Sequence, residues 1–150
     1  MGLLGVTPVL LWRISDFTEL DGIGGEFAAG RWHRKGRRIV YAAEHAALAL
    51  LEALVRFDER RSDLAPGYQL LRIEGPEAPP EEWTGGVPDT DASRAWGDDW
   101  LASGRSLYAR VPAIVAPHSH NWLINPAHEA ASEVRLVSAE RWDWDARLLP

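Results

Sequence analysis

One glutamate stands where a carboxylate could take part in chemistry. Residues 43–57 consist mostly of strong helix formers and contain neither glycine nor proline, which predicts a helix. At about 100° per residue, the apolar side of that helix holds Ala47, Leu50, Leu51 and Leu54. Glu52 falls beside this stripe, so its carboxylate could reach a cleft at the edge of the core. The alternative is a solvated pair with Arg56, which contributes only roughly 0.2–0.5 kcal/mol.

A basic and aromatic segment precedes this helix. Arg31, Trp32 and His33 follow a glycine, and further basic residues lead to a short strand predicted at 38–42, which holds Tyr41. Arginine can hold a pyrophosphate through paired hydrogen bonds, and an aromatic ring can cover a heterocycle. The segment therefore predicts a site for a small phosphate-bearing ligand. In the alternative interpretation, Trp32 packs in the core and the arginines form a solvated basic face.

A second polar segment is expected to be a loop over residues 118–126. Asn125 and, just beyond it, His128 could bind a ligand, although Asn125 could instead cap the turn that the following proline makes. His118 and His120 are spaced by two residues and no carboxylate motif accompanies them. We therefore predict no metal site.

The elements that must position these residues alternate between strands and helices. Apolar runs predict strands at 9–14, 38–42, 68–74, 106–111 and 134–139, with a short extended piece at 114–116. Helices are expected at 43–57 and, after Asp91 as N-cap, at 92–102, with one or two helical turns at 127–133. The glycines at 21–25 and the Pro- and Gly-rich stretch 75–88 indicate irregular structure. This pattern predicts an α+β fold with a small mixed sheet flanked by helices.

Composition limits the class of protein. A chain of 150 residues fits one compact domain, 1–150, and it contains no cysteine, which excludes disulfides and thiolate chemistry. It has no apolar run long enough to span a membrane and no secretory leader pattern, so we expect a soluble, cytoplasmic protein without membrane contact. A net charge of −6 argues against direct nucleic-acid binding. The basic cluster at 31–38 nevertheless suits a small anionic ligand.

Taken together in order, the motifs resemble the RES-domain family. They are Gly30-Arg31-Trp32, Val40-Tyr41-Ala42, 46–52, Val111-Pro112 and 121–128, within a similarity that runs from Trp12-Arg13 to the C-terminal strand. The resemblance implies a fold like that of the ADP-ribosyltransferases. It also implies the toxin half of a bacterial toxin–antitoxin pair, with NAD as substrate, no further cofactor, and an Xre-type helix-turn-helix antitoxin as partner. A homo-oligomer or a toxin–antitoxin hetero-oligomer is compatible with this assignment.

The resemblance also implies which residues act. Arg31, Tyr41 and Glu52 would form the catalytic trio. Substrate-binding roles are expected for Arg13, Trp32, His33, Asn125 and His128.

Three positions depart from the family pattern, and Ala113 is the one that matters most. Ala113 stands where the family has a serine after Val-Pro, and His33 and Trp122 replace the commoner Asn and Tyr. A lost neutral hydrogen bond costs about 0.5–1.5 kcal/mol, which is a rate factor of roughly 2–13. The expected activity is cleavage of the nicotinamide–ribose bond of NAD, with water, phosphate or a protein side chain as acceptor. The alternative is a catalytically weakened RES-like module that serves mainly as a binding partner of the antitoxin.

Overall fold

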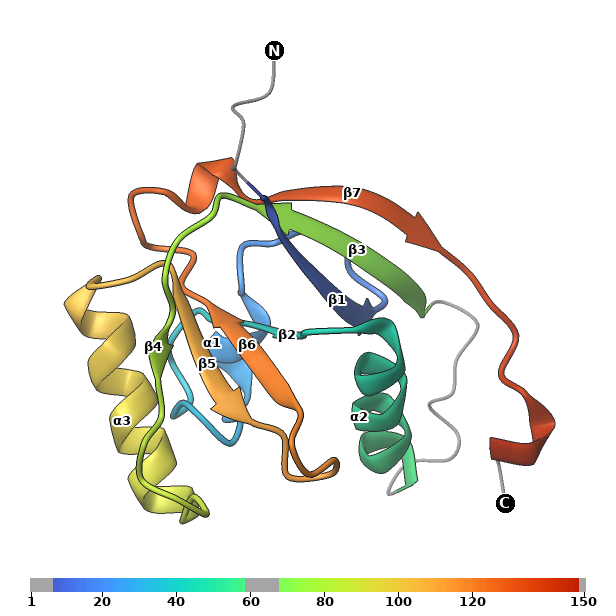
Figure 1. Cartoon of the computed structure of the whole chain (residues 1–150), viewed down its shortest axis with the longest axis horizontal. Helices are drawn as coiled ribbons and strands as arrows, with labels where there is room; N and C mark the ends of the chain where they lie inside the picture. Colours follow the sequence, from blue (N-terminus) through green and yellow to red (C-terminus); the bar gives the residue numbers. More distant parts are fainter. Residues whose placement is uncertain (1–6, 59–67, 149–150) are drawn as a thin grey trace.

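A mixed sheet organises the chain in the computed structural model, which describes residues 7–58 and 68–148 (Figure 1). Within these residues the sheet has seven strands in the order β4-β5-β6-β2-β1-β3-β7. β4 and β5 are parallel, and all other neighbours are antiparallel. The strands are β1 (Val9–Ser15), β2 (Val40–Ala43), β3 (Gln69–Gly75), β4 (Glu81–Glu82), β5 (Tyr108–Pro112), β6 (His120–Ile124) and β7 (Arg135–Glu140).

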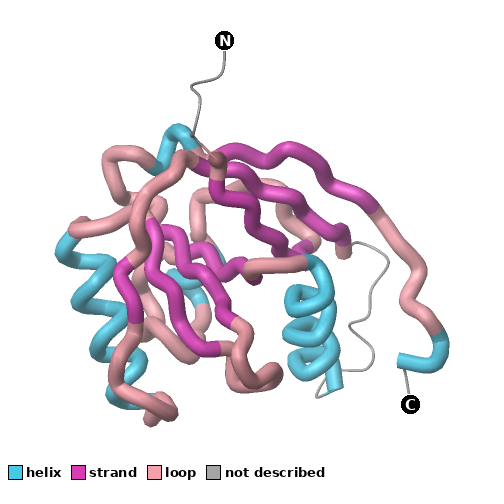
Figure 2. Tube along the Cα trace, in the orientation of Figure 1, coloured by secondary structure: helices cyan, strands magenta, loops and turns pink. Residues whose placement is uncertain are grey.

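Two long helices flank this sheet, so the predicted α+β class is confirmed. α2 (Ala46–Asp58) and α3 (Thr90–Ser103) lie at opposite ends of the molecule in the view of Figure 2. The shorter helices are α1 (Gly24–Phe27), η2 (Ala131–Glu133) and η3 (Ala146–Leu148). None of the helices in the described part of the chain is long and apolar enough to cross a membrane.

α2 packs against β1 and β2 with a different face from the one that the sequence predicts. Leu48, Ala49 and Ala53 are buried, whereas Leu51 and Val55 are 37% and 52% exposed. The predicted stripe was only partly right: Leu50 and Leu54 are half-buried, but Ala47 and Leu51 are exposed. The face in contact with the sheet is rotated toward Leu48, Ala49 and Ala53. The buried face therefore includes the side that carries Glu52.

α3 is held by a cap and by aromatic packing. The carboxylate of Asp89, two residues before the predicted cap, accepts from the N–H groups of Asp91 and Ala92. Trp100 is fully buried with Trp32, and Trp83 and Trp96 pack against the same cluster. A Cβ on Gly97 would collide with the backbone carbonyl of Trp32, so only glycine allows this close approach.

Four predicted segments differ from the structure. Residues 120–124, expected to lie in a loop, form strand β6, which pairs with both β2 and β5. Residues 81–82, within the stretch 75–88 expected to be irregular, form the short strand β4 beside β5. Residues 114–116 form a turn instead of an extended piece, and the predicted irregular segment 21–25 ends in the helical turn α1. In each case tertiary pairing or a local turn overrides a weak sequence preference.

The sheet divides between β1 and β2. The registered pairing of these strands consists of Trp12 with Ala43 alone, whereas β1 pairs with β3 along its whole length. Figure 1 shows the two halves diverging from this junction, with α2 beside it. The divergence leaves space between the strands, and that space becomes the candidate site.

Candidate active site

A cleft opens where β1, β2 and α2 meet. It encloses about 450 Å³, its open mouth included. Its walls come from four elements: β1, β2, α2 and β6. The lining residues are Trp12, Arg13, Ile14, Tyr41, Ala42, Ala43, Ala49, Glu52, Ala53, Arg56 and Asn121. Two of the three residues predicted to be catalytic, Tyr41 and Glu52, thus share one cleft with the predicted binding residue Arg13.

The cleft exists because its walls are built from small residues and diverging strands. Ala42, Ala43, Ala49 and Ala53 reach little beyond the backbone, so α2 and the sheet leave room between them. Where the strands separate, the Arg13 side chain bridges them, because its guanidinium donates to the backbone carbonyl of Tyr41 at 2.7 Å. This bond satisfies a strand carbonyl beside the divergence.

Glu52 is held in the cleft by a neighbouring amide. The Nδ2 group of Asn121 donates to Glu52 Oε1 at 2.8 Å. Among residues 7–58 and 68–148, Glu52 forms no ion pair with Arg56, so the predicted alternative of a surface pair is not what the structure contains. One carboxylate oxygen is thereby fixed by the protein, and the other remains available to a ligand.

Asn121 was missed as a site residue because residues 118–126 were interpreted as loop. Once 120–124 is recognised as a strand, alternation places Asn121 on the same face as the buried Leu123. A polar residue on an inward-facing strand position is the signal that could have found it.

Tyr41 is positioned through His33. The His33 Nε2 atom lies 3.2 Å and 3.0 Å from the carbonyl oxygens of Gly25 and Ala28, so we assign the ring proton to Nε2. Nδ1 then accepts from the Gly30 N–H at 3.2 Å and from the Tyr41 hydroxyl at 2.7 Å. His33 therefore positions Tyr41. It is buried, which corrects the expectation that it touches substrate directly.

The hydroxyl of Tyr41 is fully engaged with the protein. Besides donating to His33, it accepts from the backbone N–H of Trp32 at 3.1 Å. Burial raises the pKa of Tyr41 well above its ordinary value, so the phenol is neutral at any physiological pH. What Tyr41 offers the cleft is thus its ring.

Arg31 lies on the loop beside Tyr41 without lining the cleft. Its side chain is exposed and has no hydrogen-bond or ion-pair partner among the described residues. Its backbone is fixed by α3, because Ser93 Oγ donates to the Arg31 carbonyl at 2.6 Å and Arg94 Nε donates to the Gly30 carbonyl at 2.8 Å. The exposed guanidinium thus extends from an anchored backbone, on the loop whose Trp32 N–H donates to the cleft-lining Tyr41.

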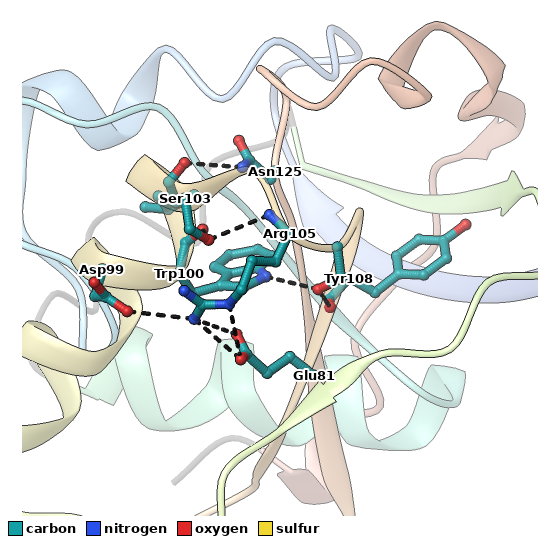
Figure 3. A network of polar contacts seen from close by, with 9 residues as sticks. Glu81, Asp99, Trp100, Ser103, Arg105, Tyr108 and Asn125 are labelled. Atoms are coloured by element: carbon teal, nitrogen blue, oxygen red, sulfur yellow. Dashed lines mark hydrogen bonds and ion pairs between the residues drawn. The ribbon is translucent and has the colours of Figure 1, made fainter.

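Three of the predicted binding residues have structural roles here. Trp32 is 2% exposed and meets Trp83 and Trp96 edge to face, so the core interpretation of this residue holds and its ring cannot cover a ligand. Asn125 is also buried, and its Nδ2 group donates to the carbonyl of Leu101 at the α3 side (Figure 3). The Nδ1 atom of His128 accepts from the Ala130 N–H, which caps a local turn.

The network around Asn125 joins α3 to the sheet, away from the cleft. Arg105 bridges Glu81 and Asp99, as Figure 3 shows. The indole N–H of Trp100 donates to the Ser106 hydroxyl at 3.0 Å. None of these residues lines the cleft. The polar residues of this region therefore connect α3 to the sheet. Within the motif at 121–128, Asn121 lines the cleft, whereas Asn125 belongs to this network.

Ala113 follows β5 and is 6% exposed. It belongs to the same apolar cluster as the cleft-lining Ala49 and Ala53, but it does not line the cleft itself. Across the described part of the chain, no group of three His, Asp or Glu side chains is arranged to hold a metal ion. The cleft offers the carboxylate of Glu52, the amide of Asn121, the aromatic rings of Trp12 and Tyr41, and the guanidinium groups of Arg13 and Arg56.

The chain is similar to proteins of one known family. The RES domain matches residues 10–145. "Toxin Res" of Pseudomonas putida is 34% identical over 145 residues, which cover 93% of this chain and 99% of the relative. The "Prs ADP-ribosylating toxin" of a Sphingobium species is 32% identical over 155 residues, 92% of this chain and 95% of the relative.

A solved structure supports the same fold. A chain in the crystal structure of the M. tuberculosis MbcT-MbcA toxin-antitoxin complex superposes with a TM-score of 0.74 over 91% of this chain and 85% of that chain. At 14% sequence identity, this similarity concerns the fold alone.

Proposed function

The chain belongs to the RES domain family of toxins, and from that premise we propose that it consumes NAD by cleaving the bond between nicotinamide and ribose. The observation that carries this proposal is the Glu52 carboxylate, fixed by Asn121 in a cleft whose wall includes the Tyr41 ring. The name of the Sphingobium relative, an ADP-ribosylating toxin, supports the same class of chemistry.

Cleavage of this bond suits a fixed carboxylate. As the bond between ribose and nicotinamide breaks, its electron pair goes to the nicotinamide nitrogen, which leaves as a neutral molecule without needing a proton. Positive charge develops on the ribose as an oxocarbenium-like centre. A preorganised anion facing that charge stabilises the transition state more than the ground state. Glu52 takes this role, with its free oxygen accepting from a ribose hydroxyl.

The neighbouring residues bind and orient the substrate. The Tyr41 ring, held by His33, stacks on the nicotinamide or the sugar, because its hydroxyl is already occupied. Arg31 approaches the pyrophosphate from the mouth of the cleft, where a planar fork binds phosphate oxygens in pairs. The acceptor that completes the reaction is water, phosphate or a protein side chain. The partner that restrains the toxin is an Xre-type antitoxin.

The purified protein incubated with NAD tests the proposal directly. We expect free nicotinamide to appear, and Glu52→Gln to lower the rate by about 10²–10³ while the melting temperature stays unchanged. Glu44→Gln, a change of the same kind outside the cleft, is the matched control. A wild-type protein that releases no nicotinamide would favour the alternative that Ala113 motivates, a module that only binds its antitoxin.

A further inference from the structure

The arginines of this protein divide into two groups. Eight of those described form ion pairs with carboxylates: Arg34, Arg37, Arg38, Arg72, Arg105, Arg110, Arg135 and Arg147. Five others have no carboxylate within ion-pair distance among the described residues: Arg13, Arg31, Arg56, Arg94 and Arg141. Arg13 and Arg56 line the cleft. Arg31 lies on the loop beside Tyr41, and Arg94 on α3 donates to the carbonyl of Gly30 in that loop. Two of the arginines that lack a carboxylate partner among the described residues therefore share the cleft.

Arg13 is a costly residue to leave without a counter-ion. One N–H of its guanidinium donates to the Tyr41 carbonyl, and its other N–H groups have no protein acceptor among the described residues. Burial, followed by the charge of Arg56, lowers the pKa of Arg13 to about 10, and the charge of Asp16, which is not within ion-pair distance, opposes this shift only in part. Arg13 still carries its charge at neutral pH, and both cations line the same cleft.

Arg56 could have been neutralised within its own helix. Glu52 lies one turn earlier on α2, at the spacing that favours an ion pair, yet its carboxylate is bonded to Asn121 instead. The exposed Arg56 therefore lies at the cleft wall, and its guanidinium has no acceptor among the described residues.

We propose that Arg13 and Arg56 form an anion subsite inside the cleft that binds a phosphoryl group. The proposal rests on the function proposed above and deepens it, because it assigns a second phosphate contact, separate from Arg31, within reach of the carboxylate that acts on the ribose. Two forked cations suit a doubly charged tetrahedral oxyanion better than a single carboxylate. The phosphoryl group belongs either to the dinucleotide or to free phosphate bound next to the reacting ribose.

Direct binding of a simple anion tests the subsite without any turnover. Inorganic pyrophosphate and inorganic phosphate are titrated by calorimetry into the wild-type protein, Arg56→Gln and Arg56→Lys. Arg13 is left intact because its bond to β2 supports the fold. Arg141→Gln is the matched control, since Arg141 is also exposed and unpaired among the described residues but lies outside the cleft.

We expect Arg56→Gln to weaken anion binding about 10-fold or more, Arg56→Lys to restore part of it, and Arg141→Gln to leave it unchanged. Equal affinity in wild type and Arg56→Gln, or an equal loss in Arg141→Gln, would overturn the subsite. This result is independent of NAD turnover, so it stays distinguishable from a failure of the proposed function.

Kinetics then identify the source of the phosphoryl group. If the subsite holds the dinucleotide, Arg56→Gln raises KM for NAD about 10-fold and changes kcat little. If it holds free phosphate, KM for NAD is unchanged and the wild-type rate rises with added phosphate, whereas the rate of Arg56→Gln does not. Either pattern supports the subsite. A variant that matches wild type in KM, in kcat and in its response to phosphate contradicts it.

Discussion

The two long helices pack on the sheet with opposite kinds of side chain. α2 faces the sheet with Ala49 and Ala53, and a cleft remains beside them. α3 faces it with Trp100 and Trp96, which fill the space between helix and sheet together with Trp32. None of the cleft-lining residues comes from α3.

The two sides of the sheet therefore have different tasks. The α3 side stabilises the fold, and the α2 side leaves room for a ligand. On the α3 side, large aromatic rings and a buried Ser93 anchor the backbone of the loop that carries Arg31. On the α2 side, small residues leave the space in which a substrate would lie. Tight packing far from the cleft therefore positions the exposed arginine, and loose packing near the carboxylate admits the ligand.

Gly97→Ala should have the largest effect, because it disrupts the packing of α3 against the loop that carries Trp32. The new Cβ would collide with the Trp32 carbonyl, and backbone cannot move aside as a side chain can. We expect a loss of about 3 kcal/mol or more in the free energy of unfolding, measured by urea denaturation. Gly24→Ala is the control, because a Cβ there meets no atom within 4 Å. Equal stability of the two variants would contradict the close helix–loop approach.

Ala53→Leu should fill the cleft beside α2 with a larger side chain. The larger side chain enters the cleft, so we expect NAD consumption to fall on the order of 100-fold, with a loss of stability of about 1–3 kcal/mol at most. Ala47→Leu makes the same change on the exposed face of α2 and should leave the rate unaffected. If Ala53→Leu keeps the wild-type rate, the cleft between α2 and β1 is not where substrate binds.

Tyr41→Phe tests the link between the two sides, because Tyr41 lines the cleft and also bonds to His33 and Trp32 of the loop anchored by α3. The change removes the partner of His33 and of the Trp32 N–H but keeps the ring. We expect a stability loss of about 1–3 kcal/mol and an activity loss below about 10-fold. Tyr41→Leu, which also removes the ring, should lose far more activity. A Phe variant as inactive as Glu52→Gln would show that the hydroxyl itself contacts the substrate.

Ala113→Ser has the smallest expected effect. Restoring the family's hydroxyl was predicted to raise activity by roughly 2–13-fold. Because Ala113 is buried in the apolar cluster with Ala49 and Ala53 and does not line the cleft, we expect the lower end, about twofold. The measurement is kcat/KM for NAD, with Ala113→Val as a variant that adds bulk without a hydroxyl. An Ala113→Ser protein no more active than its parent would make the hydroxyl irrelevant here.

Local sequence patterns are enough to predict the α+β class, both long helices and most of the strands. These elements follow from local patterns: helix formers without glycine before Asp58, and apolar runs bounded by turn residues. The sequence also singles out Glu52 and Tyr41, because their residue types and their places in the motifs are local properties that require no knowledge of packing.

Which side chains reach the cleft depends on contacts between distant parts of the chain. Trp32 and Asn125 looked suited to binding, yet both are buried, because the sheet and α3 close over them. Asn121 and Arg56 became site residues only when β6 and α2 were placed beside the divergence of β1 and β2. The orientation of a helix face and the pairing of a short strand depend on contacts distant in sequence, and a pattern of neighbouring residues does not contain them.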